Sequence, residues 1–272
     1  MRQEEAVQDI TASLKKDPAV RSIFLKGSMG RNDHDAYSDI DLYCMVEEKE
    51  EQAFLKRRID HLKAYKELIF TDDIFIIAPQ IIGVYEDHLH IDLFTVTEAT
   101  FQNKDYFTVL YDPDGIMDPF GTEGKLTLTK TALTEHMLDV SWFLFQYWKA
   151  AARGSAVWAV EMLRHVMRYL ANVLLYKYEP DRSVLGLKAL PKYLPEDKRF
   201  RIEAIYEWMT PSLHRKAARE ILLLLKEEGD WIRHVFSEEE KAVVFMESVV
   251  VLLSEEPGIE RDGELPIIRG NR

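Results

Sequence analysis

Residues 24–31 read Phe-Leu-Lys-Gly-Ser-Met-Gly-Arg, and residues 38–42 read Ser-Asp-Ile-Asp-Leu. The apolar run from Arg21 to Leu25 predicts a buried strand that stops at Gly27, where Gly-Ser predicts a turn into a short helix. Such a turn offers free backbone N–H groups and a hydroxyl, which suit nucleotide phosphates. Gly27 also lets the backbone approach a ligand closely because it has no side chain.

Three aspartates follow this turn. Asp39 and Asp41 are two positions apart at the start of a predicted strand, so both carboxylates point to one face while the apolar residues beside them face the core. Adjacent carboxylates repel each other unless a cation joins them. Asp92 lies in the apolar run His90–Phe94, where an unpaired carboxylate is costly. If this run lies beside the strand that carries Asp39 and Asp41, the three acids converge.

A site made only of carboxylates suits Mg²⁺, which keeps several waters and completes its shell with substrate phosphates. Nucleotidyl transfer needs such an arrangement. In that reaction the metal neutralises a triphosphate, a base accepts a hydroxyl proton, and the oxygen attacks the α-phosphorus while pyrophosphate leaves. One or two metal ions are both compatible with the pattern.

The N-terminal half alternates between predicted strands and helices, and the C-terminal half is helical throughout. In the first half we expect helices at 4–16 and 47–66, and strands at 21–25, 40–46, 74–77, 81–85, 89–96 and 109–111, with turns at 79–80 and 86–87. In the second half apolar residues recur at helical spacing over 133–152, 158–178, 202–208, 213–226 and 239–253. The pattern predicts an α+β protein: an N-terminal domain, residues 1–124, with a small mixed sheet and flanking helices, and an all-α helical bundle, residues 125–272.

These motifs resemble the signature of the nucleotidyltransferase superfamily that includes DNA polymerase beta. Gly27-Ser28, Asp39-x-Asp41 eleven positions after the serine, and Asp92 on a later strand carry the resemblance. Residues 90–93, 109–115, 158–168 and 188–194 also resemble the streptomycin-type aminoglycoside adenylyltransferases. The stretch 27–46 and the overall length resemble the lincosamide nucleotidyltransferases.

The resemblance implies a role for each matching position. Gly27 and Ser28 would hold the triphosphate, and Asp39 and Asp41 would ligate Mg²⁺. Asp92 would serve as the general base on the acceptor hydroxyl or as a further metal ligand.

Outside these acids, the resemblance implies that Lys188 reaches the phosphates from the helical domain, which would close over substrate and nucleotide. Many relatives have Gly where this chain has Asn32, a residue that tolerates a left-handed backbone. Arg31 beside it is a candidate phosphate contact, although an exposed loop arginine is the commoner situation. Glu161 and Arg168 are candidate substrate contacts.

Two polar patterns also have structural explanations. A polar stripe at helical spacing is formed by Glu161, His165, Arg168 and Asn172, and such a stripe is usually a solvated helix face. His88 and His90 flank Leu89 and would point one way on a strand, where such a pair can ligate metal. Since no supporting Cys or His follows, we assign both histidines a structural role.

The composition limits the classes of partner. The 272 residues include 35 Lys plus Arg and 47 Asp plus Glu, a formal charge of −12, and we see no cluster of Lys and Arg, so nucleic acid is not an expected partner. A single cysteine, the lack of a secretory signal and the lack of a membrane-length apolar stretch predict a cytoplasmic protein without a membrane partner. A monomer and a homodimer are both compatible.

The hypothesis from sequence is therefore a Mg²⁺-dependent nucleotidyltransferase that moves a nucleoside monophosphate, AMP from ATP being favoured, onto a hydroxyl of a small molecule. An aminoglycoside or a lincosamide antibiotic is the expected acceptor. The alternatives are a nucleotide-binding module without turnover and a nucleotidyltransferase that modifies a protein.

Overall fold

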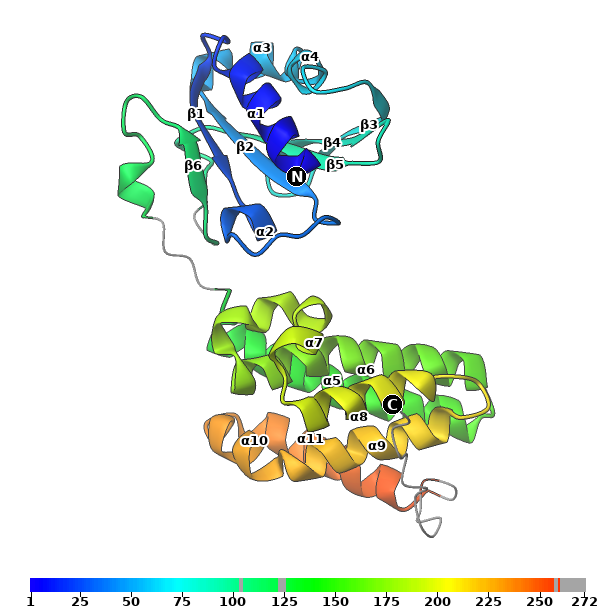
Figure 1. Ribbon diagram of the computed structural model, residues 1–272. Helices are drawn as coiled ribbons and strands as arrows, with labels where there is room; N and C mark the ends of the chain where they lie inside the picture. Colours follow the sequence, from blue (N-terminus) through cyan, green and yellow to red (C-terminus); the bar gives the residue numbers. More distant parts are fainter. Residues whose placement is uncertain (103–104, 122–125, 257–258, 260–272) are drawn as a thin grey trace. The chain divides into compact units, whose positions relative to one another are not determined.

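The protein comprises two compact units, residues 1–125 and 126–272, in a computed structural model that describes residues 1–102, 105–121, 126–256 and 259 (Figure 1). The boundary predicted between residues 124 and 125 lies in a segment, 122–125, outside the described residues.

A mixed sheet of six strands forms the first unit, in the order β3-β4-β5-β2-β1-β6. The strands are β1 (Val20–Leu25), β2 (Ile40–Val46), β3 (Leu68–Phe75), β4 (Pro79–Tyr85), β5 (His90–Val96) and β6 (Thr108–Tyr111). Only β2 and β5 pair in parallel, and every other neighbouring pair is antiparallel. The strand that carries Asp92 pairs with the strand that carries Asp41, which is the condition under which the acids converge.

Helices cover one face of this sheet. They are α1 (Arg2–Leu14), α3 (Glu51–Leu55) and α4 (Arg58–Leu62), while α2 (Gly27–Gly30) follows β1 directly. Ala6, Ile10 and Leu14 recur at helical spacing on α1 and are fully buried in the core between the helices and the sheet. Figure 1 shows α1 crossing β1 and β2 on this face.

The single helix predicted over 47–66 is wrong. A 3₁₀ turn at Glu48–Glu50 and the short helices α3 and α4 occupy this segment. The break falls at Arg57, whose Nη2 donates to Oδ1 of the buried Asp17 carboxylate at 2.7 Å. The next residue, Arg58, is 1% exposed in its side chain and donates from Nε to the Leu55 carbonyl at 3.1 Å. Arg58 also donates from Nη2 to Asp73 Oδ1 at 3.0 Å, so carboxylates distant in sequence bind both guanidinium groups where the helical pattern is interrupted.

The first hairpin also differs from its prediction. β3 begins at Leu68, six residues before the strand predicted at 74–77, and the chain turns at 76–78 rather than at Pro79-Gln80, which belongs to β4. As an edge strand, β3 is exposed along most of its length, so it lacks the apolar alternation that reveals a strand. The turn predicted at 86–87 is confirmed by the bond from His88 N–H to the Tyr85 carbonyl at 2.8 Å.

The second unit is helical where described, which confirms the α+β class. Its helices are α5 (Lys130–Ala152), α6 (Ala156–Tyr178), α7 (Leu190–Tyr193), α8 (Glu196–Glu207), α9 (His214–Glu227), α10 (Gly229–Val235) and α11 (Glu240–Ser254), with a 3₁₀ segment at Pro180–Lys188 (Figure 1). The five predicted helices are confirmed, whereas α7, α10 and the 3₁₀ segment were not predicted. All three are short, so their apolar periodicity is too brief to read from sequence.

The long helices α5 and α6 pack against each other around one large apolar core. Leu144 on α5 and Leu163 on α6 are fully buried in it. Gly154, at φ 70°, forms the turn between these helices, and a Cβ there would meet no atom within 4 Å. Among the described residues, no helix has both the length and the apolar content needed to cross a bilayer.

Candidate active site

The parallel pairing of β2 with β5 places Asp41 directly opposite Asp92. Ile40 and Leu42 beside Asp41, and Ile91 and Leu93 beside Asp92, are all fully buried in the core under α1. Because successive side chains on a strand alternate between faces, both carboxylates emerge on the opposite face of the sheet. The register thus brings together two acids that are distant in sequence.

Asp39, His90 and Asp92 form a cluster on that face. His90 Nδ1 is 3.8 Å from Asp39 Oδ2, and His90 Nε2 is 3.3 Å from Asp92 Oδ1. One nitrogen or oxygen from each of the three side chains lies within 4.8 Å of the others. These atoms are nitrogen and carboxylate oxygen donors, so the cluster fits a divalent cation.

Asp41 lies beside this cluster, against the backbone of Gly27. A Cβ placed on Gly27 would stand 1.8 Å from Asp41 Oδ2, and Gly27 has a φ of +60°. Any side chain at this position would meet both the carboxylate and an unfavourable backbone conformation. Glycine is therefore required where the strand turns next to the acid.

The local electrostatics show the strain of gathering these acids. Burial, followed by the charges of Asp39 and Asp92, raises the pKa of Asp41 to about 6. The carboxylate of Asp92, 3.3 Å from His90 Nε2, raises the pKa of His90, and the charges of Asp39 and Asp41 act in the same direction. A cation bound to these acids would remove the same repulsion.

Ser28 supplies a hydroxyl at this edge of the sheet. Its Oγ is buried and has no hydrogen-bond partner within the described chain. A buried hydroxyl without a partner costs free energy, so it indicates a group that a ligand satisfies. Beside Gly27 and the acids, a phosphate oxygen fits this donor.

The loop after Ser28 agrees with the sequence at Asn32 and differs at Arg31. Asn32 has a φ of 57°, which confirms the left-handed conformation that its amide side chain tolerates. Arg31 is not an exposed loop arginine: its side chain is 11% exposed, and its Nη1 donates to Asp105 Oδ2 at 2.9 Å. Arg31 also lies 3.5 Å from Asp33, and its charge lowers the pKa of Asp41. Its phosphate contact remains a prediction.

His90 is the site residue that the sequence analysis missed. The two histidines do not act as a pair, because His88 lies in the turn before β5 with a φ of 61°, while only His90 is on the strand. The signal was the two-residue spacing between His90 and Asp92, which puts both side chains on one face of β5. The spacing between His90 and Asp92 does not by itself indicate a metal site, because the position of Asp39 beside β5 cannot be known from the sequence.

The candidate residues of the second unit line two neighbouring pockets. Lys188 and Arg168 line a pocket of about 620 Å³, and Glu161 and Arg168 line another of about 360 Å³. Asn172 departs from the solvated stripe predicted for this helix, because its amide donates to the Ser183 carbonyl at 2.7 Å. The roles of Lys188, Glu161 and Arg168 in binding remain predictions.

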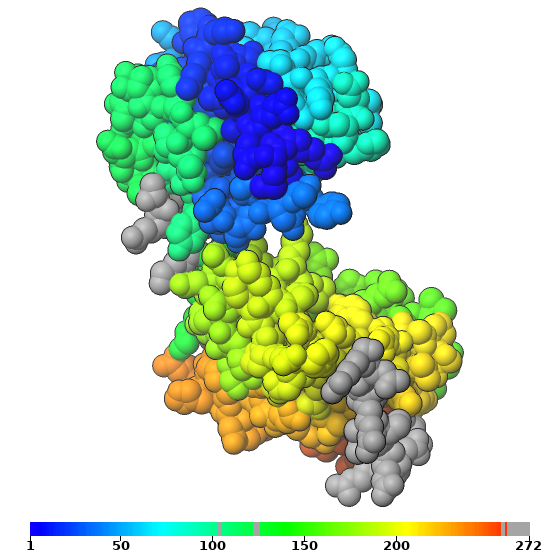
Figure 2. All heavy atoms as spheres, viewed as in Figure 1, coloured from blue at the N-terminus to red at the C-terminus, as the bar shows by residue number. Residues whose placement is uncertain are grey.

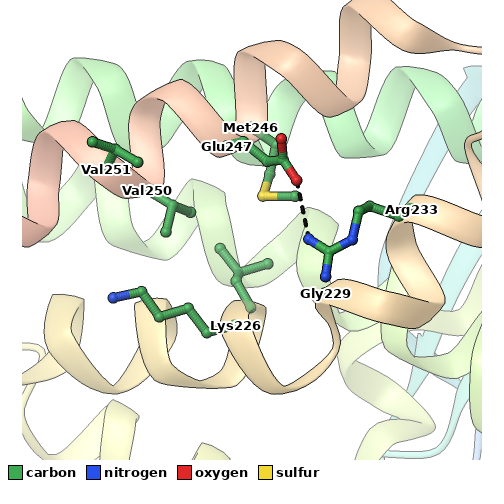
Figure 3. A pocket seen from close by; sticks show the side chains of 8 residues that line it. Lys226, Gly229, Arg233, Met246, Glu247, Val250 and Val251 are labelled. Atoms are coloured by element: carbon green, nitrogen blue, oxygen red, sulfur yellow. Dashed lines mark hydrogen bonds and ion pairs between the residues drawn. The ribbon is translucent and has the colours of Figure 1, made fainter.

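A further pocket of about 310 Å³ lies between α9, the start of α10 and α11 (Figure 3). Met246 and Val250 give it an apolar wall, and Arg233 donates to Glu247 across its rim at 3.0 Å. None of the candidate residues lines this pocket.

Residues 8–82 match the family described as Polymerase beta, Nucleotidyltransferase. The match places a nucleotidyltransferase domain of the polymerase beta type within the first unit, over residues 8–82.

Several solved structures are similar to the chain, whereas no curated protein matches it. The aminoglycoside 6-adenyltransferase from Bacillus subtilis is 15% identical, with a TM-score of 0.37, over 92% of this chain and 99% of that one. A nucleotidyltransferase-like protein from Exiguobacterium sibiricum 255-15 is 12% identical, with a TM-score of 0.35, over 93% and 89% of the two chains. Neither similarity is close enough to indicate what this chain acts on.

Proposed function

We propose that this protein transfers a nucleoside monophosphate, AMP from Mg·ATP, to a hydroxyl group of a small molecule. The observation that carries the proposal is the pairing of Asp41 with Asp92 beside the turn formed by Gly27 and Ser28. The hydrogen-bond donors that would bind phosphate therefore lie beside the acidic residues at one edge of the sheet, as in-line transfer to an α-phosphorus requires.

The strand order gives each side of the site a different role. β1 leads into Gly27 and Ser28 and lies beside β2, so the triphosphate belongs on that side of Asp41. β5 lies on the other side of β2 and has β4 as its outer neighbour, so Asp41 lies between Asp92 and the strand that leads into the phosphate turn. We therefore place the acceptor hydroxyl on the Asp92 side.

In this mechanism Asp92 accepts the proton of the acceptor hydroxyl, whose oxygen forms the new bond to the α-phosphorus. The bond between the α-phosphorus and the bridging oxygen breaks, and pyrophosphate leaves with that electron pair. Ser28 Oγ donates to a phosphate oxygen and orients the triphosphate. Asp39, Asp41, Asp92 and His90 are the residues that would hold Mg²⁺, which supplies neutralisation of the triphosphate charge.

The acceptor proposed is an antibiotic of the aminoglycoside or lincosamide type. The support for this step is the sequence resemblance of residues 90–93, 158–168 and 188–194 to streptomycin-type adenylyltransferases, and of residues 27–46 to lincosamide nucleotidyltransferases. The formal charge of −12 agrees with a cationic acceptor, since it attracts cations over a long range.

Pyrophosphate release from ATP, measured with and without Mg²⁺ against streptomycin, other aminoglycosides and lincomycin, tests the proposal. We expect release with one acceptor, dependent on Mg²⁺ and absent in the double variant Asp39→Asn/Asp41→Asn. Binding of ATP without release across the panel would favour a non-catalytic nucleotide-binding module. Transfer of label from ATP to a protein band would favour a protein acceptor.

Ser28→Ala should weaken catalysis without weakening the fold. Because the buried Ser28 Oγ has no partner in the described chain, its removal should raise the free energy of unfolding by about 1 kcal/mol. The lost hydrogen bond to phosphate should lower kcat/KM for ATP about 10-fold. Initial-rate kinetics and urea unfolding of the same preparation measure the two effects.

Ser22→Ala is the matched control for this variant. Ser22 on β1 is also fully buried, but its Oγ donates to the Tyr111 carbonyl at 2.9 Å. This replacement should therefore destabilise the protein by about 1 kcal/mol while leaving KM for ATP unchanged. Equal KM values for Ser28→Ala and the unaltered protein would contradict the phosphate role of Ser28.

A further inference from the structure

The sheet face that carries Asp92 continues outward over β4 and β3 as two rows of side chains. Ile82 pairs with Asp92, and Asp72 pairs with Ile82, which forms one row across three strands. Val84 pairs with His90 and Phe70 with Val84, which forms the next row. Paired residues share a face of the sheet, so all these side chains point to the side where the catalytic acids lie.

This face is open and apolar beside Asp92. Phe70 is 52% exposed, and Ile82 and Val84 are partly exposed, whereas the alternate residues of β4 are buried under the helices. The following row closes the surface: Phe94 and Gln80 are 7% and 5% exposed, and Phe94 packs in the separate aromatic core on this face. The open apolar surface is thus limited to the part of the sheet next to the acids. We call Phe70, Ile82 and Val84 the apolar shelf.

An irregularity in β3 places Phe70 on the shelf. The register with β4 shifts between Leu68 and Phe70, so that Leu68 pairs with Tyr85 and Phe70 with Val84. Leu68 packs against the core under α1, and the extra residue, Ile69, lets the strand change face before Phe70. Without the shift, Leu68 and Phe70 would share one face, because they are two residues apart.

We propose that the apolar shelf and Asp72 form the binding surface for the acceptor molecule. This inference rests on the proposed function, because that function places the acceptor hydroxyl at Asp92. An acceptor seated with its hydroxyl at Asp92 has Ile82 as its next contact and Val84 and Phe70 beside it. The acceptor class that fits is a hydroxylated molecule with an apolar face and a single cationic group, not a polycation.

In this proposal Asp72 binds the cationic group of the acceptor. Its side chain is exposed, and it forms no ion pair with the described part of the chain. Two strand spacings separate Asp72 from Asp92, about 10 Å, which is the span of a two-ring molecule. One carboxylate beside three apolar side chains matches one amine, whereas a molecule with several charges would place cations over Phe70, Ile82 and Val84.

The position of the shelf argues for an acceptor rather than for a protein partner. The shelf adjoins the proposed base, and it ends where Phe94 and Gln80 are buried. Other exposed apolar side chains of this hairpin lie away from the acids: Phe75 pairs with Pro79 at the far end of β3, on the face opposite to Phe70, and Ile76 and Ile77 lie in the turn that follows. β3 itself is the outer edge of the sheet, in the cyan region of the surface in Figure 2.

Calorimetric titration with lincomycin and with streptomycin tests the shelf directly. Lincomycin carries sugar hydroxyls, one basic amine and an alkylated ring, whereas streptomycin carries two guanidinium groups. We expect lincomycin to bind more tightly than streptomycin. Phe70→Ser should raise the lincomycin Kd about 10-fold, and Val84→Thr, which replaces one methyl by a hydroxyl of similar size, about 3-fold. Asp72→Asn should raise it about 3-fold at low salt and less at high salt.

Phe75→Ser is the matched control, because it removes the same side chain from the same strand at a residue 73% exposed. Its lincomycin Kd should stay within about 2-fold of the unaltered protein. Absence of lincomycin binding, a preference for streptomycin, or equal Kd values for Phe70→Ser and Phe75→Ser would overturn the shelf. Thermal unfolding of each variant checks that both serine variants fold.

Experiment can contradict the binding role of the apolar shelf and the proposed transferase activity independently of each other. Lincomycin binding that Phe70→Ser weakens, without pyrophosphate release from Mg·ATP, would support the shelf and contradict nucleotide transfer to this acceptor. Pyrophosphate release with an acceptor whose KM is the same in Phe70→Ser and the unaltered protein would support transfer and overturn the shelf.

Discussion

Asp41→Asn should abolish nucleotide transfer and at the same time stabilise the metal-free protein. The loss of activity follows from the removal of a carboxylate that lies beside both the phosphate turn and the acidic cluster. A charged ligand of this kind contributes to stabilising the transition state, so we expect kcat to fall by at least about 10³-fold. Pyrophosphate release at saturating Mg·ATP and acceptor measures this loss.

The stabilisation follows from the raised pKa of Asp41, which burial and the neighbouring carboxylates lift from its ordinary value of 3.8 to about 6 in the folded chain. A raised pKa of an acid means that the fold disfavours the charged carboxylate. The folded protein therefore loses stability as the pH rises from about 4 to about 6, and the cost is complete above that range. Asparagine has no charge to lose, so the variant should gain about 1 to 3 kcal/mol at pH 8 in a chelator, and nothing below about pH 4.

Urea unfolding at pH 4 and pH 8, with EDTA present, measures this difference. Asp9→Asn on the exposed surface of α1 makes the same charge change away from the site and should leave both activity and stability near those of the unaltered protein. A variant at Asp41 that is less stable than the unaltered protein at pH 8 would contradict the electrostatic account. Activity within about 10-fold of the unaltered protein would contradict a catalytic role for Asp41.

Gly27→Ala should damage both the fold of the first unit and its activity. The backbone at Gly27 has a φ of +60°, which costs an alanine about 1 to 2 kcal/mol, and its Cβ would stand 1.8 Å from Asp41 Oδ2. The carboxylate or the turn must move to relieve this contact. Since about 1 Å of misplacement in a reacting group costs about 10²-fold in rate, we expect kcat/KM for ATP to fall at least that far.

Gly154→Ala separates the contact from the backbone strain. Gly154 has a similar φ of +70°, but a Cβ there meets no atom within 4 Å. This variant should lose about 1 kcal/mol of stability and keep its activity. Equal activity of Gly27→Ala and Gly154→Ala would show that close approach of the backbone to Asp41 is not needed for transfer.

Local sequence was sufficient for the parts of the site that depend on strand period and turn chemistry. Asp39 and Asp41 were predicted to share a face because side chains alternate along a strand, and the burial of Ile40 and Leu42 confirms which face is the core. Asn32 was predicted to accept a left-handed backbone and does so. Each of these conclusions involves residues within a few positions of each other.

The errors arose where distant partners decide the outcome. The helix predicted over 47–66 is interrupted at Arg57, which donates a hydrogen bond to Asp17, 40 residues away in the sequence. Arg31 is held by Asp105, 74 residues away, so its apparent place on an exposed loop was wrong. Which distant charged residue a side chain contacts in the folded protein cannot be predicted from its neighbours in the sequence.

The sequence by itself predicted most of the strands and the longer helices, the turn at Gly27-Ser28 and the shared face of Asp39 and Asp41, because these follow from local chemistry and apolar periodicity. Only the tertiary structure decided that Asp41 lies opposite Asp92, that His90 joins the cluster, and that a shift in β3 turns Phe70 toward the acids. Register between strands that are far apart in sequence is fixed by packing of the whole sheet, and a one-residue shift moves every side chain to the other face.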